Sequence, residues 1–443
     1  MLNIALFPKR KLPFFVFCLA VVIGNWLVSM KAIILCGGFG KRLLPLTYRV
    51  PKVMVPIAGK PVLQHLIEIC RNAGVHEIII SLNSMQKPIE EHFGNGGRHG
   101  VKLSYVYEDS MREQDKLGAV GAIQYALSKA AVESGGQVEG DWIIMGGDNV
   151  FYGLDLKQLA QKHAASNAFA TLALYRLKDK ADCEQYGVVE IDGRGRITQM
   201  QEKPKLSQAV SDMACTAVYH VGEAFLREYL PKYVEEAKNS EKKPDRLGDL
   251  WARYAKEVPL YGHAFEGLWG DANSPKTYVE TNKQAMRFVV GSAAGITCNI
   301  EDGSCSAISS KAQIHPDALI KGPCIIEEGC VIEKGAVVGR GTHLMKGCVV
   351  GEGASVHASI VFEKCTIGSN ARLTECVVDA GCTIGNNASI EPYAMLGFSS
   401  KVGANARVLE ECRIWPFVEI GDGAIIGGDV MLDPKLFEGK LKL

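Results

Sequence analysis

Apolar and polar residues follow two alternating patterns between residues 30 and 290. Continuous apolar runs bounded by glycine or polar residues are typical of buried strands and occur at 31–36, 77–82, 142–145 and 168–175. Runs with apolar residues at helical spacing occur at 62–73 and 156–165. Strands alternating with helices predict an α/β fold, with a parallel sheet covered by helices on both faces. Such sheets bind ligands at the carboxyl ends of their strands, where Gly37-Gly38 and Asp148 lie.

The C-terminal part of the chain has apolar residues at a period of six. They are Ile314, Ile320, Ile326, Ile332, Val338, Leu344, Val350 and Val356, and then Ile384, Ile390, Leu396, Val402, Val408, Ile414, Ile420 and Ile426. The phase slips between these runs, with five-residue steps from Phe362 to Ile367 and from Leu373 to Val378. Neither a helix nor a simple strand has a period of six, but a parallel β-helix with three sides per coil does. The pattern resembles the left-handed hexapeptide-repeat β-helix and predicts one over residues 311–432.

Four cysteines of the repeat region, Cys330, Cys348, Cys365 and Cys382, lie about one coil apart. A metal or redox stack is one interpretation of this ladder. We favour the other, in which the position requires a small, weakly polar residue in a tight interior. The chain has 14 cysteines without compact disulfide spacing, which is ordinary in a reducing cytosol and predicts a cytoplasmic protein.

The remaining segments differ from both patterns. Residues 1–29 hold basic residues followed by an apolar run at 14–28, which resembles a signal segment or short anchor but is short for a membrane span of about 20 residues. Because Met30 directly precedes the first strand, we expect it to be the true start, with a real leader as the alternative. Residues 291–310, rich in Gly, Ser and Ala, are predicted to be a linker, and 433–443 a tail.

The charge balance limits the class of partner. Lys+Arg and Asp+Glu both number 49, so the formal net charge is zero. Binding to a nucleic-acid backbone needs a surplus of cations that displace counterions, so nucleic acid is not expected as the main partner. A small anionic ligand remains compatible, because its pocket needs only a few local cations.

The first predicted strand runs into a glycine-rich loop, Gly37-Gly38-Phe39-Gly40-Lys41-Arg42-Leu43. Glycine lets the backbone approach a ligand closely, and backbone N–H groups can cradle phosphate oxygens. Arg42 and Lys52 add fixed cations for a polyphosphate. A dinucleotide-binding motif would need glycine at Leu43, and a P-loop would need Ser or Thr at Arg42, so neither motif is matched.

This loop, together with Pro51-Lys52, resembles the signature of the sugar-1-phosphate nucleotidylyltransferases, and the resemblance extends over most of residues 30–430. The chain is most similar to mannose-1-phosphate guanylyltransferases with a C-terminal β-helix, a group that Arg413-Ile414-Trp415-Pro416 also resembles. The resemblance implies a Rossmann-like, mostly parallel sheet domain at 30–290, followed by the left-handed β-helix. It implies transfer of a nucleotidyl group from an NTP to a sugar 1-phosphate, with GTP and mannose 1-phosphate favoured. Glucose 1-phosphate with dTTP, UTP or ATP is a close alternative.

The resemblance also implies roles for individual residues. Asp148 and Asp271 would bind Mg²⁺, which bridges phosphate oxygens. The nucleotide would contact Gly37, Gly38, Gly40, Lys41 and Gly118, and the sugar phosphate would contact Gly187, Glu202 and Lys203. The implied catalytic residues are Arg42, Lys52, Asp148 and Lys203, which act by positioning and by neutralising charge in one in-line displacement.

Four positions depart from the family pattern, namely Lys41, Ala119, Cys215 and Asn273. These departures put substrate identity in doubt and motivate a second hypothesis, a non-catalytic regulatory subunit that binds a nucleotide sugar. A third hypothesis is acyl transfer by the β-helix, with His315, His343 or His357 as general base. We expect the β-helix instead to support assembly of a homo-oligomer.

Overall fold

The computed structural model describes residues 30–109, 117–133, 136, 138–239, 246–289, 296–298 and 305–431. The predicted leader at 1–29 and tail at 433–443 lie outside these residues, as does part of the predicted linker at 291–310. Within the described part of the chain, no helix is both long and apolar enough to cross a membrane.

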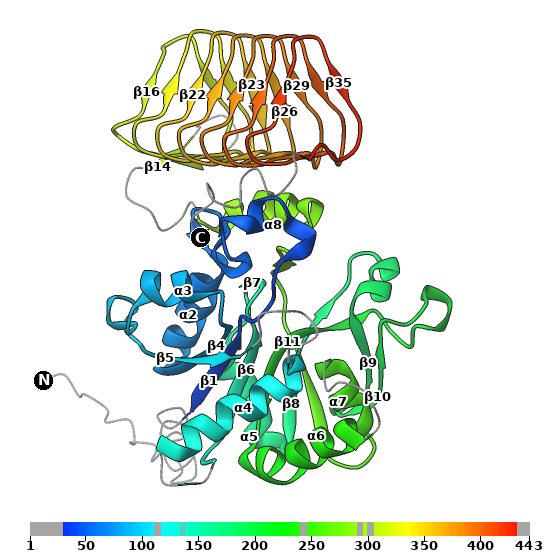
Figure 1. Ribbon diagram of the computed structural model, residues 1–443. Coiled ribbons are helices and arrows are strands. Elements are labelled where there is room, and N and C mark those ends of the chain that lie inside the picture. The colour runs from blue at the N-terminus through cyan, green and yellow to red at the C-terminus, as the bar shows by residue number, and fades with distance from the viewer. Residues whose placement is uncertain are drawn as a thin grey trace, which may run out of the picture.

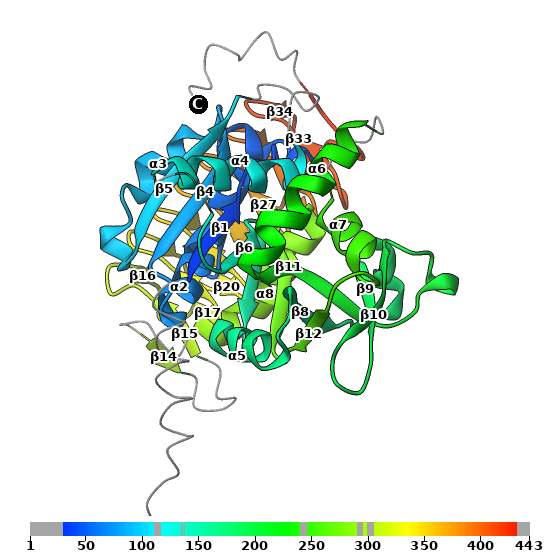
Figure 2. The ribbon, with the colours of Figure 1, turned by 90° about the horizontal axis from the view of Figure 1, so that it is seen from below.

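The first half of the chain is built around a sheet of nine strands. Its strands are β1 (Lys31–Leu35), β4 (Glu77–Asn83), β5 (Lys102–Glu108), β6 (Trp142–Gly146), β8 (Ala170–Arg176), β9 (Gly187–Ile191), β10 (Ile197–Glu202), β11 (Met213–Val221) and β12 (Leu260–Ala264). The order is β10-β9-β11-β6-β1-β4-β5, with β8 pairing with β11 and β12 (Figure 2). The strands β6, β1, β4 and β5 are parallel, as predicted, whereas β11 is antiparallel to β6, β8 and β9.

Helices cover both faces of this sheet. They are α2 (Val62–Ala73), α3 (Lys87–Phe93), α4 (Gly118–Glu133), α5 (Leu156–Ser166), α6 (Leu230–Asn239) and α7 (Leu247–Tyr254), whereas α8 (Pro275–Val289) packs against the β-helix. Successive side chains of a strand point to opposite faces, so Ala32 and Ile34 pack with α2, α3 and α5, and Ile33 packs with α4, α6 and α7. This explains why the sequence of β1 is a continuous apolar run, because both of its faces are buried.

Short elements connect the main ones. The strands are β2 (Pro56–Ile57), β3 (Lys60–Pro61), β7 (Asn149–Tyr152) and β13 (Leu268–Asp271). The short 3-10 helices are η1 (Lys41–Leu43), η2 (Leu46–Tyr48), η3 (Lys52–Met54), η4 (Gly97–His99), η6 (Lys180–Gln185) and η7 (Leu206–Gln208), and η8 (Phe225–Tyr229) is a short π-helix. Three of these turns, η1 to η3, follow β1 in succession and form the segment that carries the predicted phosphate-binding cations.

The second half of the chain is a parallel β-helix whose three sides are sheets that each have seven parallel strands, as expected of the left-handed hexapeptide-repeat fold (Figure 1). One of these sheets packs against the first half of the chain and is called the docked sheet. It contains the parallel strands β15 (Cys305–Ile308), β18 (Ile325–Ile326), β21 (His343–Leu344), β24 (Ile360–Val361), β27 (Val377–Val378), β30 (Met395–Leu396) and β33 (Arg413–Ile414). The second sheet consists of β16 (Gln313–Ile314), β19 (Val331–Ile332), β22 (Val349–Val350), β25 (Thr366–Ile367), β28 (Thr383–Ile384), β31 (Lys401–Val402) and β34 (Glu419–Ile420). The third sheet consists of β17 (Leu319–Ile320), β20 (Val337–Val338), β23 (Ser355–His357), β26 (Arg372–Thr374), β29 (Ser389–Ile390), β32 (Arg407–Val408) and β35 (Ile425–Ile426).

Two short strands lie in the segment predicted to be a linker. They are β14 (Ile296–Cys298) and β15, which pair in antiparallel fashion. Because β15 also pairs with β18, it is the first parallel strand of the docked sheet, and β14 adds an eighth, antiparallel strand at its edge. The β-helix therefore begins a few residues earlier than the six-residue apolar period indicates.

The cysteine ladder lies inside the β-helix. Cys330, Cys348, Cys365 and Cys382 are fully buried. Each thiol donates a hydrogen bond of 3.0 to 3.1 Å to a backbone carbonyl oxygen, those of Met345, Phe362, Asp379 and Gly397 respectively. This agrees with a small, weakly polar interior residue, because the thiol fills the space and satisfies a carbonyl group at the same time.

The first phase slip is displaced by one residue from its predicted position. Val361 belongs to the interior cluster of the β-helix, whereas Phe362 packs outside it. The five-residue step therefore runs from Val356 to Val361, and the prediction that it begins at Phe362 was wrong. The two residues are adjacent and both apolar, so periodicity alone favoured the one that continues a six-residue step.

The docked sheet joins the two halves of the molecule (Figure 1). Its outward side chains Ile325, Ile360, Val377 and Met395 are buried in one apolar cluster with residues of the segment 43–62 and of α8. Burial of apolar area is the main favourable contribution to such an interface. The segment that follows the glycine-rich loop is therefore part of the interface with the β-helix.

Candidate active site

The glycine-rich loop lies at the carboxyl end of β1 and is held by two buried amide side chains. The Asn83 Nδ2 group donates to the Gly37 carbonyl oxygen and the Gln86 Nε2 group to that of Gly38, both at 3.1 Å. Gly40 has a φ of 65°, and a Cβ there would lie 2.8 Å from Thr47 Cγ2, so only glycine fits. The sequence analysis did not identify Asn83 and Gln86, because a polar residue after a strand carries no specific signal by itself.

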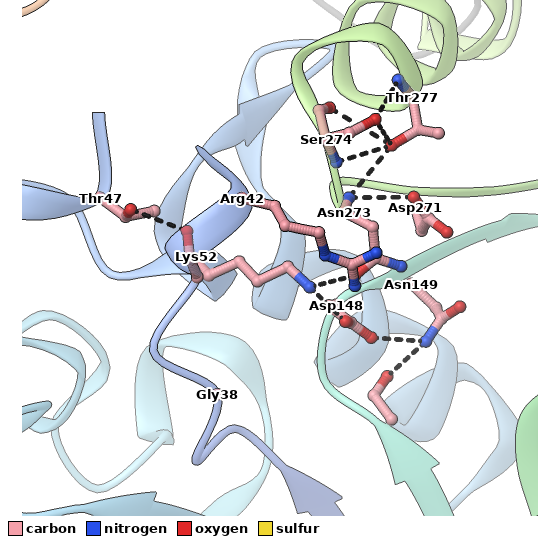
Figure 3. Close-up of polar contacts among 12 residues, drawn as sticks. Gly38, Arg42, Thr47, Lys52, Asp148, Asn149, Asp271, Asn273, Ser274 and Thr277 are labelled. Carbon is pink, nitrogen blue, oxygen red and sulfur yellow. Dashed lines mark hydrogen bonds and ion pairs between the residues drawn. The ribbon is translucent and has the colours of Figure 1, made fainter. Parts of the chain in front are cut away.

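Asp148 faces this loop from the end of β6 (Figure 3). Gly147 makes the approach possible, because a Cβ on it would lie 2.6 Å from the Leu35 carbonyl oxygen, to which its own N–H donates at 2.9 Å. The buried ammonium group of Lys52 donates to the Asp148 carboxylate and to the Asn273 amide oxygen. The structure thus brings together Lys52 and Asp148, which sequence analysis placed in separate motifs.

Asp271 reaches the same place through an unpredicted pair of strands. The strand β13 is antiparallel to β7, with Asp271 paired to Asn149, the residue after Asp148. The Ala272 N–H also donates to the Asp148 carbonyl oxygen at 3.3 Å. Two acidic residues far apart in the sequence therefore occupy neighbouring positions in the structure.

Both carboxylates have defined hydrogen-bond partners. The Asp271 Oδ1 atom accepts the Asn273 N–H at 2.9 Å, and its Oδ2 atom accepts the Tyr186 hydroxyl at 3.3 Å. Burial tends to raise the pKa of Asp148, but the charge and hydrogen bond of Lys52 outweigh it and the pKa is lowered. Asp148 is therefore ionised at neutral pH. Two carboxylates with free lone pairs are the oxygen donors that a hard divalent cation prefers.

Arg42 lies on η1. Its Nη2 group donates to the Asn273 Oδ1 atom at 3.2 Å (Figure 3). The side chains of Arg42 and Lys52 therefore meet at one amide oxygen. This places Asn273, which sequence analysis singled out as a departure from the family, in contact with both predicted phosphate-binding cations.

The predicted sugar-binding residues lie on the strands β9 and β10. Gly187 pairs with Glu202 across these strands, and a Cβ on Gly187 would lie 2.8 Å from Glu202 Oε2. Burial raises the pKa of the Glu202 carboxyl group. Lys203 is exposed and left-handed, with a φ of 49°, and its N–H donates to the Tyr186 carbonyl oxygen at 3.2 Å. Tyr186, which hydrogen-bonds Asp271 at its other end, connects this region to the two acidic residues.

Two of the predicted nucleotide-contacting residues, Gly37 and Gly118, lie next to Glu108, which the sequence analysis did not single out. This buried carboxylate accepts the Leu117 N–H at 3.4 Å, next to Gly118 at the start of α4. Its Oε1 atom lies 3.6 Å from the position of a Cβ on Gly37. Gly37 and Gly118 therefore flank one side chain, while Lys41 is exposed on η1.

The other two departures from the family pattern lie away from the carboxylates. Ala119 is half-buried in the first turn of α4. Cys215 is buried on β11 in the core beneath the sheet, where burial raises the pKa of its thiol. The three histidines considered for acyl transfer do not gather, because His343, His357 and His315 lie on or after strands of three different sheets.

A second polar cluster lies near the amino end of β6. His163 and His220 stack with ring centroids 3.9 Å apart and planes inclined by 2°. The Asp141 Oδ2 atom lies 3.1 Å from His220 Nε2 and 3.7 Å from His163 Nε2. Because the rings are parallel, their nitrogen lone pairs do not converge on one point, as two ligands of one metal ion must. The cluster is better described as a buried histidine pair sharing one carboxylate.

Comparison of the chain with known proteins identifies its family. A model of the nucleotidyl transferase family matches residues 31–287, and one of the GMPPB C-terminal domain matches residues 303–378 and 320–420. The chain is 27% identical to a UTP–glucose-1-phosphate uridylyltransferase of Synechocystis, over 75% of this chain and 83% of that protein. It is 28% identical to a mannose-1-phosphate guanylyltransferase of Mycobacterium tuberculosis, over 76% and 80%.

Further relatives carry other names. The bifunctional protein GlmU of Methanococcus maripaludis is 29% identical, over 75% of this chain and 74% of that protein. A solved structure of a putative glucose-1-phosphate thymidylyltransferase from Bacillus anthracis aligns with a TM-score of 0.48 and 25% identity, covering 57% of this chain and 94% of that one. With the two family models matched in succession, the chain belongs to the sugar-1-phosphate nucleotidyltransferase family and carries a C-terminal β-helix.

Proposed function

We propose that this protein transfers the guanylyl group of GTP to mannose 1-phosphate and releases pyrophosphate. The convergence of Lys52 and Arg42 with Asp148 and Asp271 at the carboxyl end of the sheet supports nucleotidyl transfer. The choice of GTP and mannose 1-phosphate is supported by the named guanylyltransferase among the relatives and by the match of the β-helix to the GMPPB C-terminal domain. Other relatives are named for glucose 1-phosphate and UTP, so the substrate test includes these compounds.

The cations would bind the triphosphate. In the structure, the donors of Lys52 and Arg42 are directed to oxygen atoms of Asp148 and Asn273. Phosphate oxygens can replace the Asn273 amide oxygen as acceptor, because a charged donor bonds more strongly to an anion than to a neutral amide. The backbone of Gly37, Gly38 and Gly40, held in place by Asn83 and Gln86, would contact the nucleotide together with Lys41 and Gly118.

Asp148 and Asp271 would hold a Mg²⁺ ion. Both offer carboxylate oxygens from neighbouring strand ends, and Lys52 keeps Asp148 ionised, so the donor set fits a hard divalent cation. When bound, such an ion neutralises charge on the phosphate oxygens.

The sugar phosphate would lie toward β9 and β10. Lys203 would bind its phosphate, while Glu202 and Gly187 would face sugar hydroxyl groups. The sugar phosphate oxygen forms a bond to the α-phosphorus of the NTP, and the bond from that phosphorus to the α,β-bridging oxygen breaks as pyrophosphate leaves. The side chains position the two anions and offset their repulsion, which requires no covalent intermediate. Arg42 would stabilise the leaving pyrophosphate, and Lys52 would align the reacting phosphates.

The experiment measures pyrophosphate release by the chain beginning at Met30, with Mg²⁺ present. GTP, dTTP, UTP, ATP and CTP are each combined with mannose, glucose and N-acetylglucosamine 1-phosphate. We expect release with GTP and mannose 1-phosphate. Asp148→Asn should reduce the rate by about 100-fold or more, the usual effect of removing an electrostatic catalytic group. Asp317→Asn, at an exposed position of the β-helix, serves as the matched control.

Each other result has a definite meaning. Release with another pair of substrates supports nucleotidyl transfer and replaces the proposed specificity. Absence of release with every pair, from protein that is folded, would refute catalysis. Binding of a nucleotide sugar by such a protein would then favour a regulatory subunit.

A further inference from the structure

The segment between Arg42 and Lys52 touches the β-helix at two consecutive residues. The ring of Tyr48 packs edge-on against Trp415, with centroids 5.0 Å apart. The Arg49 Nη2 group forms an ion pair with the Asp379 Oδ1 atom at 2.7 Å, and its guanidinium lies 5.2 Å from the centroid of Phe398. These residues of the β-helix come from different coils, and together they form one surface that contacts the segment.

Asp379 is placed at the end of a strand of the docked sheet, directly after Val378. Its side chain is 1% exposed. The Oδ1 atom also accepts the Ala380 N–H at 2.7 Å, while the Oδ2 atom has no hydrogen-bond partner among the described residues. A buried carboxylate is costly unless it is paired, so the ion pair holds Arg49 in one place.

Only a few residues of chain separate Arg49 from Arg42 and Lys52, the two predicted phosphate-binding residues, so the position of Arg49 restrains both. Thr47 precedes Tyr48, and its hydroxyl donates to the Gly40 carbonyl oxygen at 2.9 Å. On the other side, Pro51 has a φ fixed by its ring and leads directly into Lys52 at the start of η3. The contact with the β-helix thus lies between the glycine-rich turn and the buried lysine.

We propose that the β-helix positions the polyphosphate-binding loop of the other domain through Arg49 and Asp379, which are positioning residues of the site. The contact between Tyr48 and Trp415 supports the same placement. The inference rests on the proposed function in one respect, that residues 37–52 bind the NTP. Its structural content, that Asp379 restrains this loop, does not depend on catalysis.

The interface offers a matched control. Lys283 on α8 forms an ion pair of 2.8 Å with Glu375 of the β-helix. This pair crosses the same interface and links residues of the same charge type, but Lys283 lies on α8, outside the loop at residues 37–52. Replacement of either acidic partner removes one ion pair across the interface, and Lys283 keeps Glu280 as a second partner. Loss of loop positioning would follow only from loss of the pair between Arg49 and Asp379.

The experiment compares Asp379→Asn with Glu375→Gln in the whole chain. Hydrogen exchange of the backbone amides of residues 40–52 is measured without substrate. We expect exchange there to become about tenfold faster in Asp379→Asn and to stay unchanged in Glu375→Gln, because only the first releases a local restraint. Equal exchange rates in the two variants would overturn the proposal.

Steady-state kinetics provide a second test of the effect of Asp379→Asn. With the substrate pair that the wild-type protein uses, kcat/KM for the NTP should fall by about 10- to 100-fold in Asp379→Asn, since small displacements of a positioning group have effects of this size. The KM for the sugar 1-phosphate should change much less. A fall in Tm for Asp379→Asn without a change in kcat/KM for the NTP would contradict the proposal. A wild-type protein without turnover would refute nucleotidyl transfer alone, because the exchange measurement still tests the loop.

A second variant covers the case in which Asp379→Asn does not fold. Arg49→Lys keeps the buried carboxylate paired but removes the planar group that lies over Phe398. Exchange of residues 40–52 should increase in Arg49→Lys and not in the matched variant Lys283→Arg. Unchanged exchange in folded Arg49→Lys protein would overturn the proposal.

Discussion

The docked sheet and the second sheet of the β-helix have the same type of inward-facing residue but differ in their outward-facing residues. Both place Ile, Val or Leu inward at every coil. The outward residues of the docked sheet, such as Ile360, Val377 and Met395, are fully buried, whereas Thr366, Thr383 and Lys401 at the matching positions of the second sheet are exposed. Inward residues therefore determine that a β-helix forms, and outward residues determine which side receives the other domain.

The largest difference in stability should come from placing a charge at an outward-facing position of each of the two sheets. Val377→Asp places a carboxylate in the apolar cluster between the domains, and we expect the free energy of unfolding to fall by about 3 kcal/mol or more. Thr383→Asp, at the matching position of the second sheet, should change it by less than about 0.5 kcal/mol. Urea unfolding of the two variants measures both values. Similar losses would show that the two sheets do not differ in the way their burial indicates.

A smaller difference in stability should come from truncating an outward-facing side chain of each sheet to alanine. Met395→Ala removes a buried side chain from the docked sheet and should cost about 2 to 5 kcal/mol, depending on how far the cavity collapses. Lys401→Ala at the neighbouring position of the second sheet should cost less than about 0.5 kcal/mol. Thermal unfolding of the two proteins provides the comparison. A large loss for Lys401→Ala would indicate that the second sheet is covered in the assembled protein.

The smallest effect should be a difference in the pH dependence of stability between two carboxylates of the β-helix, the buried Asp379 and the exposed Glu328. Burial raises the pKa of Asp379 at the docked sheet, although Arg49 opposes the shift. Hydrogen bonds and charges of Lys346 and Lys311 lower the pKa of the exposed Glu328 to about 2. A raised pKa means that the folded state binds the proton more tightly, so stability rises as the pH falls toward the ordinary Asp value of 3.8. The lowered pKa has the opposite sign, and its stabilisation is lost as the pH falls from 4.5 to about 2.

Urea unfolding of wild-type protein, Asp379→Asn and Glu328→Gln from neutral pH down to about pH 2 tests the signs. The stability of wild type relative to Asp379→Asn should increase as the pH falls. The stability of wild type relative to Glu328→Gln should decrease, and this difference should disappear at high salt because the charges are exposed. The same slope for both variants would contradict the assignment of the two environments.

Local patterns accounted for much of the fold and part of the site. The alternation of apolar runs predicted the parallel half of the sheet, and the period of six predicted the β-helix, because both patterns report which side of an element a residue faces. The glycine-rich loop and Asp148 were recognisable at strand ends. Assembly of a homo-oligomer stays a prediction.

The phase slip at Val361 and Phe362 is a feature that periodicity alone could not place. One residue faces the interior of the β-helix and the other faces the docked domain, and both environments are apolar. Hydropathy measures only whether a side chain is buried. It contains no information on which of two apolar environments buries it.

The sequence by itself determined the two folds, their order, and the residue types available for phosphate and metal binding. Only the tertiary structure decided that Asp271 lies beside Asp148, that Asn83 and Gln86 hold the loop, that Asn273 contacts both cations, and that Asp379 pairs with Arg49. The physical reason is that periodicity and propensity act over a few residues. These pairings depend instead on which distant elements share an interface, and that is decided by packing of the whole chain.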